Sequence, residues 1–303
     1  MKLNQVRDLI AVAERGSLRA AARYLGVAQP AITRSIRELE KELDVTLLER
    51  LPKGVVLSPM GEIFLQRAKA AQSELERARD ELQQYKGGLE GKVSVCLSTA
   101  SHIALLHNTL EPFRLRYKDA QLDITEGLFA KAEAGLKNGT LDIYVGPLAE
   151  DKISSEFIAE KLIDNERVVF CRKGHELADA TSLSELCDAD WISTAVTVRS
   201  DAELSPLFEK YGLPAPRIAL YAHSALTMMT AAAGSDLLTM LPKQWVQFAW
   251  AQSLLHRIKV KEFLPAPAMY MVRRASLPLT PAAEYFSDMI RRASVDLERT
   301  MEL

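Results

Sequence analysis

Cysteine is scarce in this 303-residue chain, which also lacks long apolar runs and any large excess of one charge sign. The three cysteines, Cys96, Cys171 and Cys187, form an odd set without CxxC spacing, so they signal neither a disulfide framework nor a zinc site. No segment approaches the ~18 uninterrupted apolar residues of a membrane span. Polar residues also interrupt the first segment, where a signal peptide needs an apolar run. We therefore expect a cytoplasmic protein with no membrane contact.

The total charge of −2 hides an excess of positive charge near the N-terminus. Residues 1–60 contain ten Lys or Arg and seven Asp or Glu, a net +3, so the remaining residues sum to −5. Segment 15–37 alone contains five arginines and no acidic residue. A chain of this length suggests two or three domains. Positive charge confined to one end is typical of a nucleic-acid reader joined to a separate second domain.

The arginine-rich segment is predicted to form two helices that meet at Gly26. Ser17 suits the N-cap of the first helix, whose apolar residues recur at helical spacing, namely Leu18, Ala21, Ala22 and Leu25. Pro30 suits the first position of the second helix, whose apolar stripe is Ile32, Ile36, Leu39 and Leu43. The pattern predicts a helix-turn-helix, in which the second helix enters the major groove of DNA.

The opposite face of the second helix carries the candidate DNA contacts, Gln29, Thr33, Arg34 and Arg37. These four residues span an arc of roughly 140° at 100° per residue. Gln pairs with adenine, Arg pairs with guanine, and Thr offers a hydroxyl and a methyl group, while Arg37 suits a phosphate. An ordinary solvated helix face has the same residue types, so the pattern alone leaves that alternative open.

A small β-hairpin is predicted after the second helix, from apolar runs at 47–51 and 55–57 around a turn at 52–54. Beside a helix-turn-helix, such a hairpin lies along the DNA backbone or enters the minor groove. Arg50 and Lys53 are its candidate contacts, and solubilising loop charges are the alternative. An amphipathic helix before Arg15 is expected to complete the small core through Leu3, Val6, Leu9, Ile10 and Ala13.

Ser58 and Pro59 begin a long helix whose apolar residues follow a heptad pattern. The seam consists of Phe64, Ala68, Ala71, Leu75, Ala78, Leu82 and Tyr85. Because an isolated helix would leave this seam in water, we expect dimerisation through it, with packing against the same chain as the alternative. Glycines follow at positions 87, 88 and 91, and they predict a hinge that uncouples the next domain.

From residue 93 onward, alternating strand and helix patterns predict an α/β domain with a largely parallel sheet. Strands are expected at 157–162, 167–172 and 258–260, among others. Ligands of such sheets bind where strands end and helices begin. Hydroxyl-rich loops at 98–101, 193–194 and 223–224 suit a small anion such as a carboxylate. Each loop also suits an ordinary helix N-cap, and one sequence does not establish that the three converge.

The run SLRAAARYLGVAQPAITRSIRELEKEL, followed by LLER, a Lys-Gly turn and LSPMG, resembles the N-terminal signature of LysR-type transcriptional regulators. The resemblance is dense over residues 1–65, and NGTLDIYVG and LLTMLP extend it. It implies a winged helix-turn-helix domain at 1–58, a dimerising linker helix at 59–87 and a hinge at 88–92. The remainder, 93–303, is implied to resemble a type 2 periplasmic binding protein with two α/β lobes, lobe I at 93–162 and 267–303 and lobe II at 163–266.

The resemblance also implies a function and a set of partners. The chain is expected to be a sequence-specific transcriptional regulator and not an enzyme, which binds promoter DNA as a dimer or tetramer and has RNA polymerase as a further partner. No cofactor is expected besides a small-molecule co-inducer held between the lobes. By position, Gln29, Pro30, Thr33 and Arg34 match residues that face bases in the family, and Lys53 matches a basic residue of the wing.

The expected effector contacts are Thr99, Ala100, Ser101, Leu128, Thr194 and Ser224. Two of them depart from the family pattern, because Ala100 stands where serine is common and Leu128 stands where a hydroxyl is frequent. The site is therefore expected to be more apolar than in carboxylate-sensing relatives. An aromatic or amphiphilic effector remains as open as an anion.

Two other classes of function compete with an effector-controlled regulator. An enzyme would need a catalytic motif, but the sequence has no GxSxG, P-loop or HExxH, and its five histidines lack metal-like spacing. A redox regulator would instead use oxidation of Cys171 and Cys187.

Overall fold

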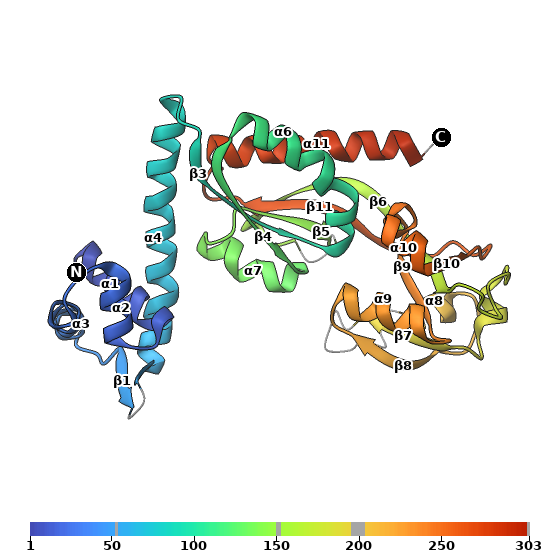
Figure 1. Cartoon of the computed structure of the whole chain (residues 1–303), viewed down its shortest axis with the longest axis horizontal. Coiled ribbons are helices and arrows are strands. Elements are labelled where there is room, and N and C mark those ends of the chain that lie inside the picture. The colour runs from blue at the N-terminus through green and yellow to red at the C-terminus, as the bar shows by residue number, and fades with distance from the viewer. Residues whose placement is uncertain (52–53, 150–152, 195–203, 302–303) are drawn as a thin grey trace.

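The computed structural model describes residues 1–51, 54–149, 153–194 and 204–301. A small helical domain at the N-terminus lies beside the long helix α4 (Pro59–Tyr85), and a two-lobed α/β domain follows (Figure 1). Lobe I lies next to α4, and lobe II lies on the far side of lobe I (Figure 1). Within the described ranges, no helix is long and apolar enough to cross a membrane.

The N-terminal domain forms because three short amphipathic helices share one core. Ser17 caps the second helix by accepting a hydrogen bond from Ala20 N at 3.1 Å, and Gly26 ends it with φ of 66°. The core buries Leu9, Val12, Ile32 and other residues, but Leu3 is 69% exposed, so its predicted place in this core is wrong. The elements are α1 (Leu3–Arg15), α2 (Leu18–Leu25), α3 (Gln29–Leu43), β1 (Leu48–Leu51) and β2 (Gly54–Leu57).

Helix α4 begins at the predicted cap, where the Ser58 side chain accepts a hydrogen bond from Gly61 N at 3.0 Å. Its first turns pack on the N-terminal domain through Phe64 and Ala68, which lie against Val6 and Ile10 of α1. An ion pair of 2.9 Å between Lys69 and Glu14 extends this contact. The start of α4 is therefore part of the N-terminal domain.

Lobe I is built on the parallel neighbours β4, β3 and β5, which contribute its buried core together with the C-terminal helix α11. The helical segment that follows β3 contains a π-helical stretch, η1, between two α-helical stretches. The elements of lobe I are β3 (Glu90–Leu97), α5 (Thr99–Ser101), η1 (His102–Leu106), α6 (His107–Arg116), β4 (Asp119–Glu126), α7 (Phe129–Asn138), β5 (Ile143–Pro147) and α11 (Pro281–Met301).

Lobe II repeats the arrangement on a smaller scale, with β7 parallel to both β8 and β9. Residues 193–194, expected in a loop, are the end of β7, and the strand predicted at 258–260 lies earlier, in β10. The elements of lobe II are η3 (Leu183–Leu186), β7 (Asp190–Thr194), α8 (Ser205–Lys210), β8 (Arg217–Ala222), α9 (Ala225–Gly234), β9 (Leu238–Pro242), η5 (Lys243–Gln247), α10 (Ala249–Leu254) and β10 (Leu255–Ile258).

Two long antiparallel strands, β6 (Phe157–Arg172) and β11 (Pro265–Arg274), connect the lobes. β6 is one continuous strand where two were predicted, because it runs through the polar segment 164–166 as it passes from lobe I to lobe II. The sheet order is β4-β3-β5-β11-β6-β9-β7-β8, with β10 also paired to β6. Since β6 and β11 pair antiparallel with their neighbours, the sheet is mixed and the prediction of a largely parallel sheet is corrected.

The sequence predicted that the glycines after α4 form a hinge that uncouples this helix from lobe I. The structure shows the opposite, because α4 and lobe I are joined by hydrogen bonds. β3 already begins at Glu90, and Lys92 N donates a hydrogen bond of 3.1 Å to Asp80 of α4. The buried Gln84 of α4 accepts from Ala282 N at 2.9 Å and donates to Glu90 O at 2.9 Å. The chain therefore reverses after α4, and lobe I packs against the helix.

Candidate DNA-binding surface and effector site

Helix α3 has one buried face and one exposed face, as its apolar stripe predicts. Ile32, Ile36 and Leu39 are buried in the core of the N-terminal domain. Gln29, Pro30, Arg34 and Arg37 are exposed, while Thr33 is half-buried and donates from Oγ1 to Gln29 O at 3.1 Å. The candidate base-reading residues therefore share the outer surface of one helix that its own core holds in place.

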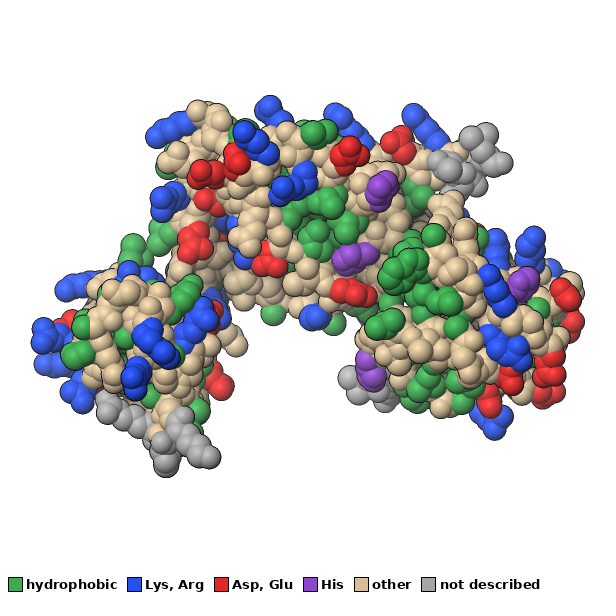
Figure 2. Space-filling view, in the orientation of Figure 1, with side chains coloured by type: hydrophobic (Ala, Val, Ile, Leu, Met, Phe, Trp, Pro, Cys, Tyr) green, Lys and Arg blue, Asp and Glu red, His purple; other side chains and the backbone are tan. Residues whose placement is uncertain are grey.

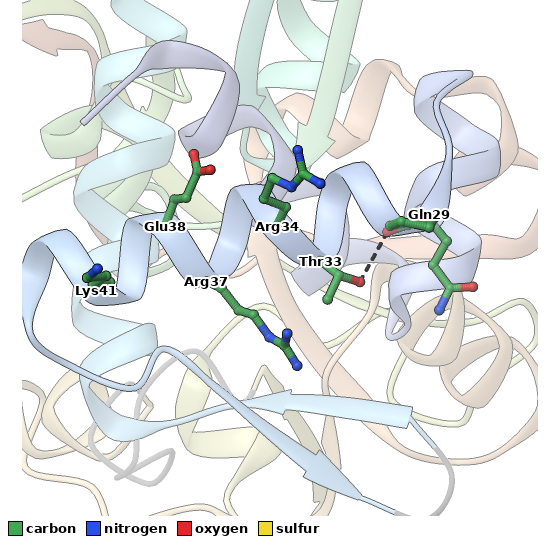
Figure 3. Close-up of a pocket in the computed structure, with 7 residues that line it drawn as sticks. Gln29, Thr33, Arg34, Arg37, Glu38 and Lys41 are labelled. Atoms are coloured by element: carbon green, nitrogen blue, oxygen red, sulfur yellow. Dashed lines mark hydrogen bonds between the residues drawn. The ribbon is translucent and has the colours of Figure 1, made fainter.

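An open hollow on this surface is lined by Gln29, Pro30, Thr33, Arg34, Arg37, Glu38 and Lys41. In Figure 3, Arg34 and Glu38 project to one side of α3, whereas Arg37 projects toward the hairpin. Glu38 and Lys41 were not among the DNA contacts predicted from the sequence. Helical spacing indicates both, because Glu38 stands four residues after Arg34 and Lys41 stands four residues after Arg37, on the same face of the helix.

The arginines of the hollow keep their hydrogen-bond donors available. Among the described residues, neither Arg34 nor Arg37 forms an ion pair, whereas Glu38 accepts from Gln5 Nε2 at 3.4 Å. Lys and Arg side chains gather over this domain in the view of Figure 2, whereas side chains of both charge signs are mixed on lobe II. In contrast to Arg34 and Arg37, Arg15 has an intramolecular partner, because its guanidinium lies 4.0 Å from the centre of the Tyr24 ring.

The hairpin is fixed to the helix-turn-helix by backbone contacts. Val55 N donates to Gly16 O at 3.2 Å, and Gly54 has φ of 143° at the point where the strand approaches Gly16. Arg50 lies in β1 opposite Val55, but its side chain and all of Lys53 lie outside the described residues. The structure therefore places the backbone of Arg50 in β1 but does not test either predicted wing contact.

In lobe I, the predicted hydroxyl cluster is largely used by the protein itself. Ser101 is fully buried, donates to Val145 O at 2.8 Å and lies 2.8 Å from the Ser98 hydroxyl, which caps α5. Ala100 is buried in the core of the lobe. Thr99 remains half-buried at the end of β3, where its hydroxyl donates to the exposed Glu126 carboxylate. Of these three predicted effector contacts, Ser101 and Ala100 are therefore buried, and Thr99 alone is partly exposed.

The other effector candidates lie after neighbouring strands. Leu128 is half-buried and immediately precedes α7. Ser224 follows β8 in lobe II, where its exposed hydroxyl caps α9 by accepting from Thr227 N at 3.1 Å. Thr194 is the last residue of β7, and its side chain is outside the described part of the chain. The six candidates therefore divide into a lobe I group and a lobe II group, each at the ends of parallel strands.

The heptad seam of α4 has a buried part and an exposed part. Phe64 and Ala68 pack on α1 of the same chain, as the intrachain alternative required. Further along, Leu75 is 51% exposed, Leu82 is 63% exposed and Tyr85 is 76% exposed. Ala71 and Ala78 are exposed as well. The second half of α4 therefore presents an apolar seam to solvent while its opposite face contacts lobe I.

All three cysteines are free thiols, and Cys96 and Cys171 are buried. Burial raises the pKa of all three, and that of Cys171 to about 11. Cys171 lies in β6 and Cys187 follows η3, within the same apolar cluster of lobe II. Because the thiolate is the reactive form, these surroundings disfavour oxidation.

Cys171 is expected to resist alkylation in the folded chain. At a pKa of about 11, only about one thiol in a thousand is ionised at pH 8. Iodoacetamide followed by mass spectrometry should leave Cys171 unmodified under native conditions and label it fully in guanidinium. Rapid native labelling, or a disulfide to Cys187 after mild peroxide, would revive the redox hypothesis.

Two family models match the chain and together cover nearly all of it. Residues 3–62 match "Bacterial regulatory helix-turn-helix protein, lysR family", and residues 86–294 match "LysR substrate binding domain". A helix-turn-helix joined to a two-lobed α/β domain of this type defines a DNA-binding transcriptional regulator with a substrate-binding domain. The chain belongs to the LysR family of transcriptional regulators.

Relatives match over most of their length at low identity. The regulator TdcA of Escherichia coli (strain K12) is 23% identical over 283 residues, which are 91% of this chain and 90% of TdcA. GbpR of Azospirillum brasilense is 25% identical over 250 residues, or 82% of this chain and 73% of GbpR.

Solved structures of full-length regulators share the fold. CbnR in complex with its target DNA has a TM-score of 0.74 at 21% identity, covering 97% of this chain and 100% of CbnR. A full-length OxyR variant from Pseudomonas aeruginosa has a TM-score of 0.70 at 21% identity, covering 96% of this chain and 95% of OxyR. At these identities the likeness concerns the fold alone.

Proposed function

We propose that this regulator reads its DNA target with α3, through Gln29, Thr33 and Arg34, while Arg37 and the wing hold the phosphate backbone. The observation that carries this proposal is the exposed surface of α3, on which Arg34 and Arg37 lie without an ion pair among the described residues. Because a bidentate guanidinium selects guanine, Arg34 supplies sequence selectivity. CbnR has been solved with its target DNA, and its similar fold supports placing the duplex against α3.

An electrophoretic mobility shift on the DNA that flanks the protein's own gene tests this proposal. Sequence-specific binding should survive an excess of unrelated competitor duplex at moderate salt. Binding that the competitor removes completely would contradict base reading by α3, because phosphate contacts alone do not distinguish sequences.

We further propose that two chains pair through the exposed half of the α4 seam and that pairs assemble into tetramers. Leu75 and Leu82 leave apolar surface in water on a helix whose other face is occupied by lobe I. Pairing of two such helices buries this surface.

The double replacement Leu75→Asp with Leu82→Asp should weaken self-association at least about tenfold, since a carboxylate would be buried in the seam. Sedimentation velocity over a range of concentrations measures the change. Gln83→Asp is the matched control, because Gln83 is an exposed residue of the same helix. An unchanged assembly of the double variant would show that pairing uses another surface.

The small-molecule effector is proposed to bind between the two lobes, where Thr99, Leu128, Thr194 and Ser224 lie at or just after the ends of parallel strands. Its polar contacts in lobe I are Thr99 and Glu126, because the Ser101 hydroxyl is already bonded within the protein. A thermal-shift screen of small acids, amphiphiles and aromatics tests the site. A ligand at 100 times its dissociation constant adds about 2.7 kcal/mol to stability, and Thr99→Val should reduce that gain.

In this proposal the chain acts as a regulator and not as an enzyme, in the cytoplasm where its DNA target lies. RNA polymerase is proposed as the partner through which bound protein affects transcription. The membership of the chain in a family of transcriptional regulators supports both statements.

A further inference from the structure

Helix α4 is joined to lobe I by a set of charged side chains, which we call the linker cluster: Glu74 and Arg77 of α4, Asp142 before β5, and Arg274 at the end of β11. Arg77 Nη2 lies 2.7 Å from Asp142 Oδ1, and Arg77 Nη1 lies 3.0 Å from Glu74 Oε1. Arg274 forms an ion pair with the same Glu74 oxygen. Negative and positive side chains therefore alternate in the order Asp142, Arg77, Glu74 and Arg274 between α4 and lobe I.

The linker cluster is shielded from solvent. The side chain of Asp142 is 5% exposed, and those of Arg77 and Arg274 are 18% exposed. Burial raises the pKa of Asp142, although the Arg77 guanidinium beside it opposes this rise. An ion pair this sheltered from water is screened much less by salt than a surface pair, and removing one partner leaves a costly unpaired charge.

The backbone of lobe I approaches α4 closely at the same place. Ser73 Oγ donates to Gly139 O at 2.7 Å. Gly139 has φ of 74°, and a Cβ atom there would lie 2.5 Å from Glu74 Oε1 and 2.9 Å from Arg77 Nη1. A side chain at this position would be strained by the positive φ and would displace the ends of the Glu74 and Arg77 side chains from the linker cluster.

Asp142 also connects the linker cluster to the effector end of the sheet. Its Oδ2 accepts from Ser94 N of β3 at 2.7 Å, and its own N–H donates to Ser94 O at 2.8 Å. Three residues further along, Val145 O accepts hydrogen bonds from Ser98 N and from the Ser101 hydroxyl, both at 2.8 Å. Three strand residues span about 10 Å, and Ile143, Tyr144 and Val145 are all fully buried.

We propose that the linker cluster couples the effector site of this regulator to its DNA-binding domain. Arg77 and Asp142 position α4 on lobe I, and the buried strand β5 links that contact to residues 98–101, which we call the effector edge. The inference rests on the proposed function, since it concerns how the effector site and the DNA-binding domain influence each other. Arg77 and Asp142 are positioning residues and touch neither DNA nor effector. A tightly packed strand cannot shift at one end without moving at the other.

Coupling between two sites is reciprocal, so DNA binding must affect the effector edge as much as an effector affects DNA binding. This reciprocity allows a test with a DNA duplex as the only ligand. Hydrogen–deuterium exchange of the full chain, with and without the flanking duplex of its own gene, reports on peptides that cover 92–97, 98–101 and 142–147.

The test variant is Arg77→Met combined with Asp142→Asn, which removes both charges and leaves neither partner buried and unpaired. Glu74→Gln is the milder variant, because it keeps the Arg77 and Asp142 pair and weakens the links of residue 74 to Arg77 and Arg274. Arg79→Met is the matched control, since Arg79 is an exposed residue of the same helix.

Without DNA, the double variant should exchange about tenfold faster than wild type in 92–97 and 142–147, with the control unchanged. With DNA, exchange at 98–101 should change in wild type and in the control, and this change should disappear in the double variant and shrink in Glu74→Gln. An equal DNA-induced change in the double variant, or no change at 98–101 in a wild-type chain that binds DNA, would overturn the coupling.

The outcomes separate this inference from the proposed function. A wild-type chain that binds no DNA would overturn the proposed function and the coupling together. The exchange rates without DNA would still decide whether the linker cluster holds α4 on lobe I. Specific DNA binding with an unchanged effector edge would contradict the coupling alone.

Discussion

Gly61→Ala is expected to destabilise the N-terminal domain while the stability of the two-lobed domain stays unchanged. Gly61 lies in the first turn of α4, where a Cβ atom would stand 2.0 Å from the carbonyl oxygen of Leu47 and 3.1 Å from the Leu57 side chain. The oxygen cannot move away freely, because Leu47 is fully buried and its carbonyl accepts from Ser58 N at 2.9 Å. The helix and the start of the hairpin must therefore separate.

The cost of this overpacking should reach the upper end of the usual range, about 3 kcal/mol. In an unstrained helix the same replacement would instead gain up to ~1 kcal/mol. Calorimetry of the full chain should show the transition of the N-terminal domain at a lower temperature, with loss of DNA binding. Gly234→Ala is the control, because Gly234 is helical and has no atom within 4 Å of the added Cβ. Similar stability of the two variants would contradict the packing of α4 against the hairpin.

Arg34→Ala and Arg37→Ala are expected to weaken DNA binding in different ways. Arg34 lies on the side of α3 away from the hairpin and is assigned to a base edge, whereas Arg37 points toward the hairpin and is assigned to a phosphate (Figure 3). Loss of a bidentate base contact costs about 1–3 kcal/mol, or roughly 5- to 150-fold in affinity for the specific site. Loss of a phosphate contact weakens specific and non-specific binding alike.

Fluorescence anisotropy with the specific duplex and a scrambled duplex separates the two effects. Arg34→Ala should reduce the affinity ratio between the duplexes, whereas Arg37→Ala should preserve that ratio. For Arg37→Ala, the slope of log K against log salt should shrink by about 1. Arg79→Met, on α4, is the control for loss of a positive charge elsewhere. Equal effects of both arginines on the two duplexes would mean that neither reads a base.

The surface of α3 was predictable because it depends on contacts close in the sequence. A 3.6-residue period fixes which side of α3 is buried, and Ser17 and Gly26 mark the ends of α2 through local hydrogen bonds and backbone angles. Glu38 was missed because an acidic residue does not fit a DNA-binding pattern, although it lines the same hollow.

The contacts of α4 with lobe I were not predictable from periodicity. Ser73, Arg77 and Asp80 fall outside the apolar seam, so periodicity alone predicts that they face solvent. Their partners in lobe I are 12 or more residues away, and Arg77 contacts Asp142 only because the chain reverses after Tyr85. Polar docking of this kind leaves no hydrophobic pattern, so the sequence shows only the three glycines, which predict a hinge.

The proposed effector residues lie at the ends of parallel strands, but the sequence does not show which of their hydroxyls are already bonded within the protein. Ser98 and Ser101 stand together in the sequence, yet the acceptor of Ser101 is the carbonyl of Val145, on another strand. A sequence cannot distinguish a serine that is free for a ligand from one that is bonded to a distant backbone atom. The continuity of β6 through its charged segment also depends on a distant part of the chain. Pairing with β11 holds segment 157–166 extended, and the local sequence does not show this pairing.

A hydroxyl-radical footprint on the DNA beside the gene tests the central claim most directly, which is that α3 reads base sequence in a paired chain. The account predicts two protected half-sites on one face of the duplex, separated by one helical turn of about 10 bp or a multiple of it. Arg34→Ala should lose the protection at concentrations where wild type still protects both half-sites. Absence of localised protection by wild type at moderate salt, or an identical footprint from Arg34→Ala, would contradict the account.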